Sequence, residues 1–101
     1  MKNPRHPDLR KVRFHDVMHA LSDPCRVKII LHLLRNHKRA FACNEIPLKI
    51  SKATRSHHFH VLRKAGLIES RFDGTRCMTS LRHSEIEKRF PGLLDIIVSN
   101  Q

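Results

Sequence analysis

Apolar residues recur at helical spacing along the first two thirds of this chain and at strand spacing after that. A first helix is predicted from Leu9 onward, with four apolar residues on one face: Phe14, Val17, Met18 and Leu21. A second helix begins where Asp23 can act as N-cap and Pro24 can take the first helical position, since a missing N–H costs nothing there. It should end near Asn36, and its apolar stripe should form the buried centre of the domain: Val27, Ile29, Ile30, Leu31, Leu33 and Leu34.

A third long helix is predicted between Ser51, a suitable N-cap, and Gly66, a suitable C-terminal stop. Its two faces differ: Phe59, Leu62 and Gly66 project to one side, and Ala53, His57, His60 and Lys64 to the other. No acidic residue occurs between Glu45 and Glu69, so nothing along this helix would repel a phosphate. Residues 42–46 can form a short preceding helix that Pro47 ends. Two helices joined by a short turn are typical of a helix-turn-helix, although a basic face alone also fits an ordinary solvated helix.

After Gly66 the apolar period falls to two, which indicates a β-hairpin. Residues 67–72 and 76–81 flank Asp73-Gly74, a pair typical of a primed turn because such turns need positive φ. Ile68, Ser70 and Phe72 share one face of the first strand, and Arg71, Thr75 and Arg76 cluster at the tip. A hairpin with arginines at its end, directly after a basic helix, predicts a wing that reaches the DNA backbone or minor groove.

The C-terminal tail is the most apolar part of the chain relative to its length. A short helix around 84–89 is interrupted at residues 90–92, and a last helix carries Leu93, Leu94, Ile96, Ile97 and Val98. This segment is expected to pack against a second copy and against the first helix. The predicted fold is therefore mainly α with a small β-hairpin (α+β), a homodimeric winged helix-turn-helix. It spans residues 9–101, preceded by a flexible basic arm at residues 1–8.

Composition narrows the class of partner. The 101 residues suit one domain, and a core of this size is modest, so a dimer that buries more apolar surface is reasonable. Twenty Lys and Arg against nine acidic residues give a net charge of +11, which predicts a polyanionic partner, nucleic acid before an anionic membrane surface. No apolar run approaches the roughly 20 residues of a membrane span, and the polar N-terminus does not resemble a secretory signal. Three widely spaced cysteines fit a reducing cytoplasm rather than a disulfide framework.

Several motifs together resemble one family. They are A-L-S-D-P-C-R-V-K-I-I at 20–30, S-K-A-T-R-S-H-H-F-H-V-L-R-K-A-G-L-I at 51–68, the Asp73-Gly74 hairpin, S-L-R at 80–82 and R-F-P-G-L-L-D at 89–95. In this order they are similar to the ArsR-type winged-helix repressors, over roughly residues 12–98. The resemblance implies a homodimer that binds a partly palindromic operator in double-stranded DNA and blocks transcription. It also implies a dimer interface formed by the first and last helices.

The resemblance further implies which side chains contact DNA. Family contacts carry over onto Lys52, Thr54, Ser56, His57 and His60 in the helix, and onto Arg71 and Arg76 in the wing. Lys64 and Thr75 join them by their place on the same helix face and at the same tip. Arg55 stands where the family usually has an aliphatic residue; either its stem follows the core edge to a phosphate, or the helix is rotated. His58 projects toward the core, where a structural role is expected, and the segment before Ser51 is shorter than in many relatives.

A sensor site is the open question. The family's thiolate metal site needs Cys-x-Cys, and here only Cys43 is present, so no metal or other cofactor is predicted. His15 and His19 are one helical turn apart, as are His83 and Glu87, so a zinc site between the first and last helices can be drawn; surface histidines are the plainer interpretation. Cys25, and Cys43 in a similar place, are redox candidates because a helix N-terminus favours the thiolate. A small-molecule inducer stays unknown.

An enzyme and a binding module without operator specificity are the two alternative classes of function. An enzyme is not expected, because the chain has no phosphate-binding glycine loop, nucleophile elbow or paired acids in an apolar setting. The main alternative is a winged-helix protein-interaction module, or a nucleic-acid binder without operator specificity, since phosphate neutralisation is independent of sequence. A repressor should prefer its operator over random duplex by about a thousandfold or more, which distinguishes the two.

Overall fold

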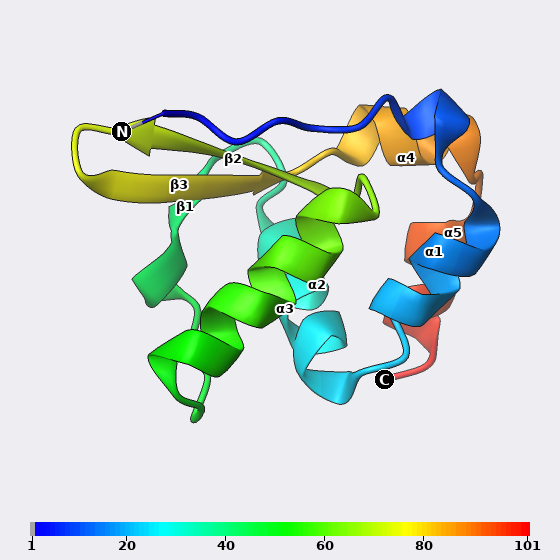
Figure 1. The fold of residues 1–101 in the computed structure, drawn as a ribbon. Helices are drawn as coiled ribbons and strands as arrows, with labels where there is room; N and C mark the ends of the chain where they lie inside the picture. Colours follow the sequence, from blue (N-terminus) through cyan, green and yellow to red (C-terminus); the bar gives the residue numbers. More distant parts are fainter. Residues whose placement is uncertain (1) are drawn as a thin grey trace.

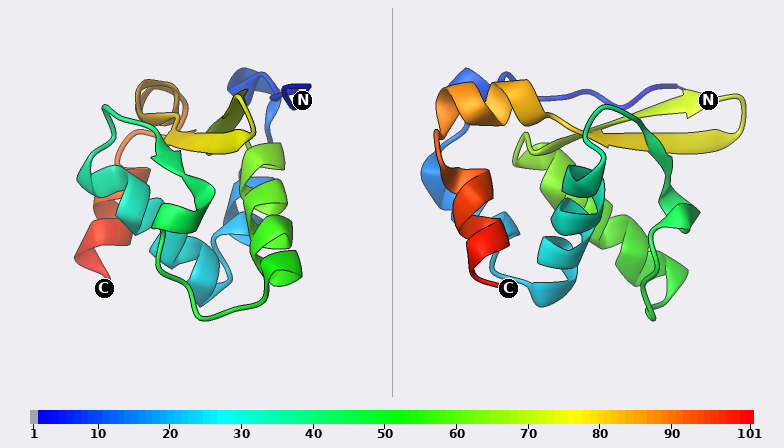
Figure 2. Two further views of the ribbon diagram at one scale, coloured as in Figure 1. Left: turned by 90° about the vertical axis from the view of Figure 1, so that its left-hand side faces the viewer. Right: turned by 180° about the vertical axis from the view of Figure 1, so that it is seen from behind.

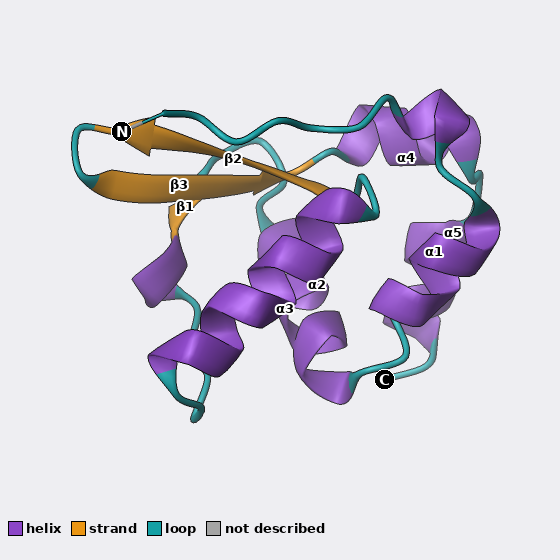
Figure 3. Cartoon of the chain, viewed as in Figure 1, coloured by secondary structure: helices purple, strands orange, loops and turns teal. Residues whose placement is uncertain are grey.

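The computed structural model describes residues 2–101 and confirms a winged helix-turn-helix (Figures 1 and 3). Five α-helices, two short 3-10 helices (η) and three strands follow one another in this part of the chain. Their bounds are η1 Leu9–Lys11, α1 Phe14–Ala20, α2 Pro24–Arg35, β1 Phe41–Ala42, η2 Cys43–Glu45, α3 Lys52–Lys64, β2 Ile68–Asp73, β3 Arg76–Leu81, α4 His83–Arg89 and α5 Leu93–Ser99.

The helix boundaries predicted from capping residues are confirmed at both long helices. At α2, Asp23 Oδ1 accepts hydrogen bonds from the backbone N–H groups of Cys25 (2.7 Å) and Arg26 (3.3 Å). At α3, Ser51 Oγ accepts from the N–H of Thr54 (3.2 Å). Gly66 has a φ of +79°, and a Cβ there would lie 2.7 Å from Leu9 Cδ1, so glycine is required for both backbone and space.

The sheet contains a strand that the sequence did not predict. Its order is β1-β3-β2, all antiparallel, with Phe41 opposite Thr79 and Ile68 opposite Leu81. The predicted short helix at 42–46 is wrong in part: Phe41 and Ala42 pair with β3, and only the three residues of η2 are helical. A two-residue strand has no period of its own, and here the free edge of β3 determines the conformation.

The wing hairpin is confirmed, but its turn lies one residue further along than predicted. Asp73 pairs with Arg76, so the two loop residues are Gly74 and Thr75. Gly74 has a φ of +64°, and no non-glycine residue among those described has positive φ. Positive φ at the first loop position only is the requirement of a type II′ turn, not of the type I′ turn that Asp-Gly suggests.

The core is centred on α2, which packs between α3, α5 and the sheet (Figure 2). Its innermost side chains are Ile29, Ile30 and Leu33, while Val27, Leu31 and Leu34 of the predicted stripe are only half-buried. The buried face is therefore rotated from the predicted one, and it includes the charged Arg26. Phe59 and Leu62 of α3 complete this core from the other side.

The first and last helices are only partly buried, although their sequences are strongly apolar. The first helix is not continuous from Leu9, because residues 12 and 13 are extended between η1 and α1. Val17 is fully buried, but Phe14 and Met18 are exposed. In α5, Leu94 lies in the core of its own chain, whereas Ile96 and Val98 point outward.

Of the N-terminal segment predicted to be a flexible arm, residues 2–8 are described and lie along β2, whereas Met1 lies outside the described residues. The N–H of Ser70 donates to His6 Nε2 (2.9 Å), and the N–H of Phe72 donates to Asn3 Oδ1 (2.8 Å). Arg82 donates to the carbonyl of Pro7 (2.9 Å). These contacts supply acceptors to the edge strand of the sheet, a need that the polar, proline-containing segment itself does not reveal. Within residues 2–101 no helix has the length and apolar character required to cross a bilayer.

Candidate nucleic-acid interface

The outward face of α3 is a row of small polar and basic side chains. All six predicted contacts other than Arg55 are exposed: Lys52, Thr54, Ser56, His57, His60 and Lys64. His58, Phe59 and Leu62 on the inward face are buried. The helical projection from the sequence therefore placed both faces correctly.

The back of α3 is held by a buried arginine. Arg26 donates from Nε to the carbonyl of Ala20 (2.7 Å) and from Nη2 to the carbonyl of His19 (3.2 Å). Its Nη1 lies 3.2 Å from Nδ1 of His58. One guanidinium thus joins the end of α1, the start of α2 and the middle of α3. The structural role expected for His58 is consistent with this position, and its partner could not be identified from the sequence.

Arg55 holds the other side of α3 and does not face outward. Its Nη1 donates to the carbonyls of Cys43 (2.9 Å) and Ile46 (2.7 Å), and its Nη2 to the carbonyl of Leu48 (3.1 Å). The predicted phosphate contact of Arg55 is therefore corrected. The side chain stays on the core side, as one of the two interpretations of the sequence predicted. Its guanidinium binds backbone carbonyls, because the short segment before α3 leaves these carbonyls without helical partners.

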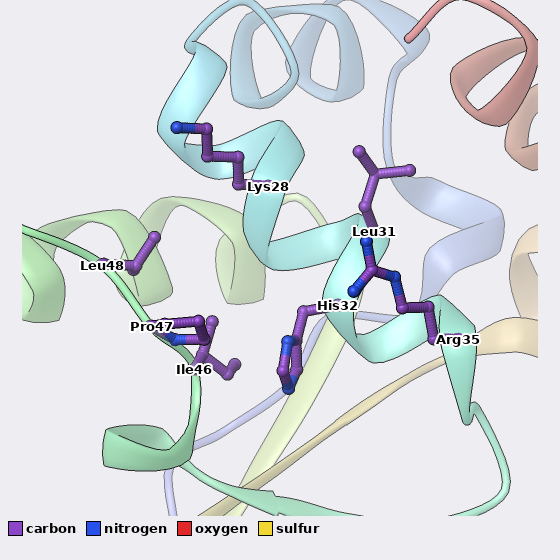
Figure 4. Close-up of a pocket in the computed structure, with 7 residues that line it drawn as sticks. All are labelled: Lys28, Leu31, His32, Arg35, Ile46, Pro47 and Leu48. Carbon is purple, nitrogen blue, oxygen red and sulfur yellow. The ribbon is translucent and has the colours of Figure 1, made fainter.

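A hollow of about 180 Å³ borders the segment whose carbonyls Arg55 binds. It separates α2 from the chain before α3, with Lys28, Leu31, His32 and Arg35 on one side and Ile46, Pro47 and Leu48 on the other (Figure 4). Ile46 nevertheless lies in the hydrophobic core, and Leu48 packs against it. The segment is therefore held both by apolar contact and by the three hydrogen bonds of Arg55.

The wing lies at the same side of the molecule as the first turns of α3 (Figure 1). Arg71, Thr75 and Arg76 are exposed on it, as predicted. Arg76 Nη2 is 3.9 Å from Glu45 Oε1, and Glu45 also pairs with Arg39 (2.6 Å). A hydrogen bond from the N–H of Ala42, together with these arginines, lowers the pKa of Glu45, so the carboxylate stays ionised and neutralises part of the positive charge.

The structure adds features to this surface that sequence reasoning missed. Lys2 and Arg5 are exposed on the segment that runs beside β2, which places two more cations near the wing. At the opposite end of α3, His60 and Lys64 share a hollow with Asp16 and His19 of α1. Asp16 therefore lies near the last turns of α3, although α3 itself contains no acidic residue. The positive charge of the first turns is offset less than that of the last turns.

The structure gives different environments to the two cysteines predicted as redox candidates, Cys25 and Cys43. Burial, the largest cause, raises the pKa of the Cys43 thiol to about 11. Cys43 therefore forms the reactive thiolate less readily than an ordinary cysteine does. The expectation for Cys43 is wrong because η2 is too short to act as a helix N-terminus, and because the thiol is half-buried beside Thr79 (3.4 Å). Cys25 does lie in the first turn of α2, where it was predicted.

The four residues of the drawn zinc site do not form a ligand cluster within the described part of the chain. His15 and His19 are on α1, but His83 and Glu87 belong to α4, not to the last helix. The ring of His83 instead stacks on that of His37, with centroids 3.8 Å apart.

Comparison with known proteins agrees with this fold. No protein-family model matches the chain. The uncharacterized HTH-type transcriptional regulator YceK of Bacillus subtilis is 37% identical over 83 residues, covering 80% of this chain and 82% of its own. An uncharacterized HTH-type transcriptional regulator of Methanocaldococcus jannaschii is 38% identical over 61 residues, 59% of this chain and 67% of its own.

Solved structures give the same architecture. An ArsR-like transcriptional regulator from Rhodococcus sp. RHA1 superposes with a TM-score of 0.63 at 24% identity, over 84% of this chain and 79% of its own. A homodimeric winged helix-turn-helix DNA-binding domain from Mycobacterium bovis reaches 0.67 at 23% identity, over 85% and 78%.

The fold and the exposed helix define a winged helix-turn-helix DNA-binding domain. The chain belongs to the HTH-type transcriptional regulators, and it has the fold of their ArsR-type members. It is a regulator and not an enzyme.

Proposed function

We propose that this chain is a repressor that binds a partly palindromic operator as a homodimer. The observation that carries the proposal is the outward face of α3, where six polar or basic side chains are exposed beside a basic wing. An exposed helix of this composition fits the major groove, where its side chains can reach base edges. The wing arginines would contact phosphates or the minor groove.

Exposed apolar side chains on α1 and α5 support the homodimer. Phe14, Met18, Ile96 and Val98 are 44–62% exposed. Phe14, Leu93 and Ile96 line one hollow, and the ring of Phe14 lies 5.4 Å from that of Phe90. Large apolar side chains gathered on one face mark a protein contact rather than a solvated surface. The M. bovis domain with the same fold is itself homodimeric.

The arrangement of the two surfaces supports operator binding by the dimer. The α1–α5 surface lies at one end of the molecule, and the wing and the start of α3 lie at the other (Figure 1). A two-fold axis through the α1–α5 surface would therefore leave both copies of α3 exposed. Two-fold symmetry in the protein corresponds to palindromic half-sites about one helical turn apart.

Within α3 and the wing, we propose two kinds of contact. Lys52, Thr54, Ser56 and His57 in the first turns read base edges. The remaining side chains position the protein on the DNA backbone: His60, Lys64, Arg71 and Arg76, with Thr75 at the tip of the wing. Arg55 is not included in either group, because its donors are already used by carbonyls.

Selection of bound duplexes from a random pool tests this proposal. The expected result is one enriched motif with inverted half-sites, bound about a thousandfold or more tightly than random duplex at the same salt concentration. Light scattering on the bound species should give two chains per site. Enrichment of no motif, with equal affinity for all duplexes, would instead favour the non-specific binder that a charge of +11 also permits.

A further inference from the structure

Three metal-ligating side chains from two helices converge behind the recognition helix. Asp23 caps α2, Cys25 lies in its first turn, and His58 comes from the inward face of α3. One ligand atom from each of them lies within 4.8 Å of the ligand atoms of the other two. Within the described chain this is the one such group of three or more, and none of its members belongs to the DNA-facing row.

The environment of the group fits a divalent metal ion. His58 is only 7% exposed, and Asp23 and Cys25 are half-buried, so bulk water competes weakly for the ion. Burial opposes ionisation of Asp23, but amide hydrogen bonds from Cys25 and Arg26 outweigh it and lower the pKa of the carboxyl. These bonds are made by Oδ1, and Oδ2 accepts no hydrogen bond from another residue among residues 2–101.

A three-ligand zinc site sets a stricter distance than the 4.8 Å within which these atoms lie. Zinc binds thiolate sulfur at about 2.3 Å and imidazole nitrogen or carboxylate oxygen at about 2.0–2.2 Å. Ligand atoms of a tetrahedral site are therefore roughly 3.3–3.7 Å apart. The three atoms lie within 4.8 Å of one another, so side-chain rotations, that of His58 included, would have to bring them into that range. One coordination position would remain for water.

We propose that Asp23, Cys25 and His58 form a binding site for a divalent transition metal ion of the zinc type. Cys25 loses its proton to the solvent and binds as thiolate, Asp23 binds through its free oxygen, and His58 binds through a neutral ring nitrogen. The site joins the start of α2 to the middle of α3. It shares no residue with the zinc site suggested by the sequence, which consists of His15, His19, His83 and Glu87.

Metal binding at this position must break the contact between Arg26 and His58. If Nδ1 of His58 binds the ion, it can no longer accept a hydrogen bond from Nη1 of Arg26, 3.2 Å away. If Nε2 binds the ion, the ring proton moves to Nδ1, which then faces another donor. Either way, His58 has to turn away from Arg26, while the two carbonyls that Arg26 also binds keep the guanidinium in place.

Cobalt(II) titration of the reduced, metal-free protein tests the site without reference to DNA. The expected result is one ion per chain, with a thiolate-to-cobalt charge-transfer band that zinc abolishes by displacement. Cys25→Ser should remove the band. Asp23→Asn should weaken binding by at least about tenfold while the helix stays capped, because asparagine caps as well as aspartate. Cys77→Ser, which changes another half-buried cysteine, should leave both band and affinity unchanged.

A band that persists in Cys25→Ser and disappears in Cys77→Ser would overturn the proposal, because the ion would then be bound elsewhere. Binding of cobalt without any thiolate band, equal in all variants, would also overturn it and assign the ion to surface histidines. Circular dichroism of each variant confirms that a lost site is not a lost fold. None of these readouts depends on operator binding, so the proposed repressor function can fail while the metal site stands.

Discussion

The two ends of this molecule expose opposite kinds of surface, polar and basic on α3 and apolar on α1 and α5. At the α3 end, the exposed side chains of the helix face are polar or basic apart from the small Ala53, and the two arginines that brace the helix are turned inward. At the α1–α5 end, four large apolar side chains are exposed instead. Polar side chains are well solvated, so the outer face of α3 is stable in water without DNA bound. The apolar end, in contrast, is stabilised only when another surface covers it.

The two ends also differ in the interactions that hold each surface in position. Hydrogen bonds from Arg26 and Arg55 fix α3 from behind, since a helix that must stay exposed cannot be held by contacts on its outer face. The apolar end is held by its inner side chains, Val17 and Leu94, while four outer ones remain 44–62% exposed in the single chain. Changes at the two ends should therefore affect different properties.

The largest expected effect separates two neighbouring residues of α5. Leu94→Asp should unfold the chain, because Leu94 is 3% exposed and a buried unpaired charge costs about 4 kcal/mol or more. Ile96→Asp, at a residue 62% exposed, should leave the fold intact and yield monomer. Circular dichroism and light scattering measure the two outcomes. Ser99→Asp adds the same charge to the same helix and should stay dimeric; a dimeric Ile96→Asp would place the interface elsewhere.

Loss of Arg55, which holds α3 from behind, should lower the stability of the protein less than Leu94→Asp does. It should lower the affinity for all DNA sequences by a similar factor. Arg55→Met removes three hydrogen bonds to carbonyls, which should lower the free energy of unfolding by about 1–3 kcal/mol. Because the segment before α3 is then loose, affinity should fall for operator and random duplex alike. Arg35→Met, at an exposed arginine of α2, serves as the control in urea titrations. If Arg55→Met changed only the salt dependence of binding, a direct phosphate contact would be indicated instead.

A change on the outer face of α3 should affect specificity and leave stability unaltered. His57→Ala is expected to reduce the preference for operator over random duplex by about 1–3 kcal/mol if the ring contacts a base edge. Competition binding at constant salt measures this ratio. His15→Ala, at an exposed histidine of α1, should leave the ratio unchanged. Equal loss for both variants would show that general charge, rather than the helix face, determines discrimination.

The wing should contribute less and without regard to sequence. Arg76→Ala is expected to weaken all duplexes similarly and to reduce the slope of log affinity against log salt by about one. The effect is limited because Glu45 already neutralises part of the charge of Arg76 at 3.9 Å. Glu45→Gln provides the reciprocal test and should strengthen non-specific binding. Loss of operator preference in Arg76→Ala would instead indicate that the wing reads bases.

The smallest expected effect concerns the cysteine at the α3 end. With its pKa raised from about 9 to about 11, Cys43 should hold roughly one hundredth of the thiolate of an unfolded control at pH 8. Alkylation by iodoacetamide, followed by mass spectrometry, should therefore be slow until urea is added. Since the unfolded thiol loses its proton first, stability should fall as pH rises from 9 to 11, and Cys43→Ala should lack this dependence.

Much of the fold could be predicted because local chemistry is strong at particular residues. Asp23 with Pro24, and Ser51 with Gly66, mark helix ends through backbone hydrogen bonds and dihedral preferences that need no other part of the chain. The same holds for the exposed row of α3, which follows from helical period alone. The candidate interface was therefore identifiable from the sequence, with the exception of Arg55.

The sequence by itself determined the two long helices, the hairpin and the basic face, because these depend on spacing along one chain. Only the tertiary structure decided where the long side chains of Arg26 and Arg55 end, that β1 pairs with β3, and that Cys25 meets His58. Each of these depends on a partner many residues away. An arginine or histidine can reach any of several unpaired backbone or side-chain groups, and packing selects which of them is near.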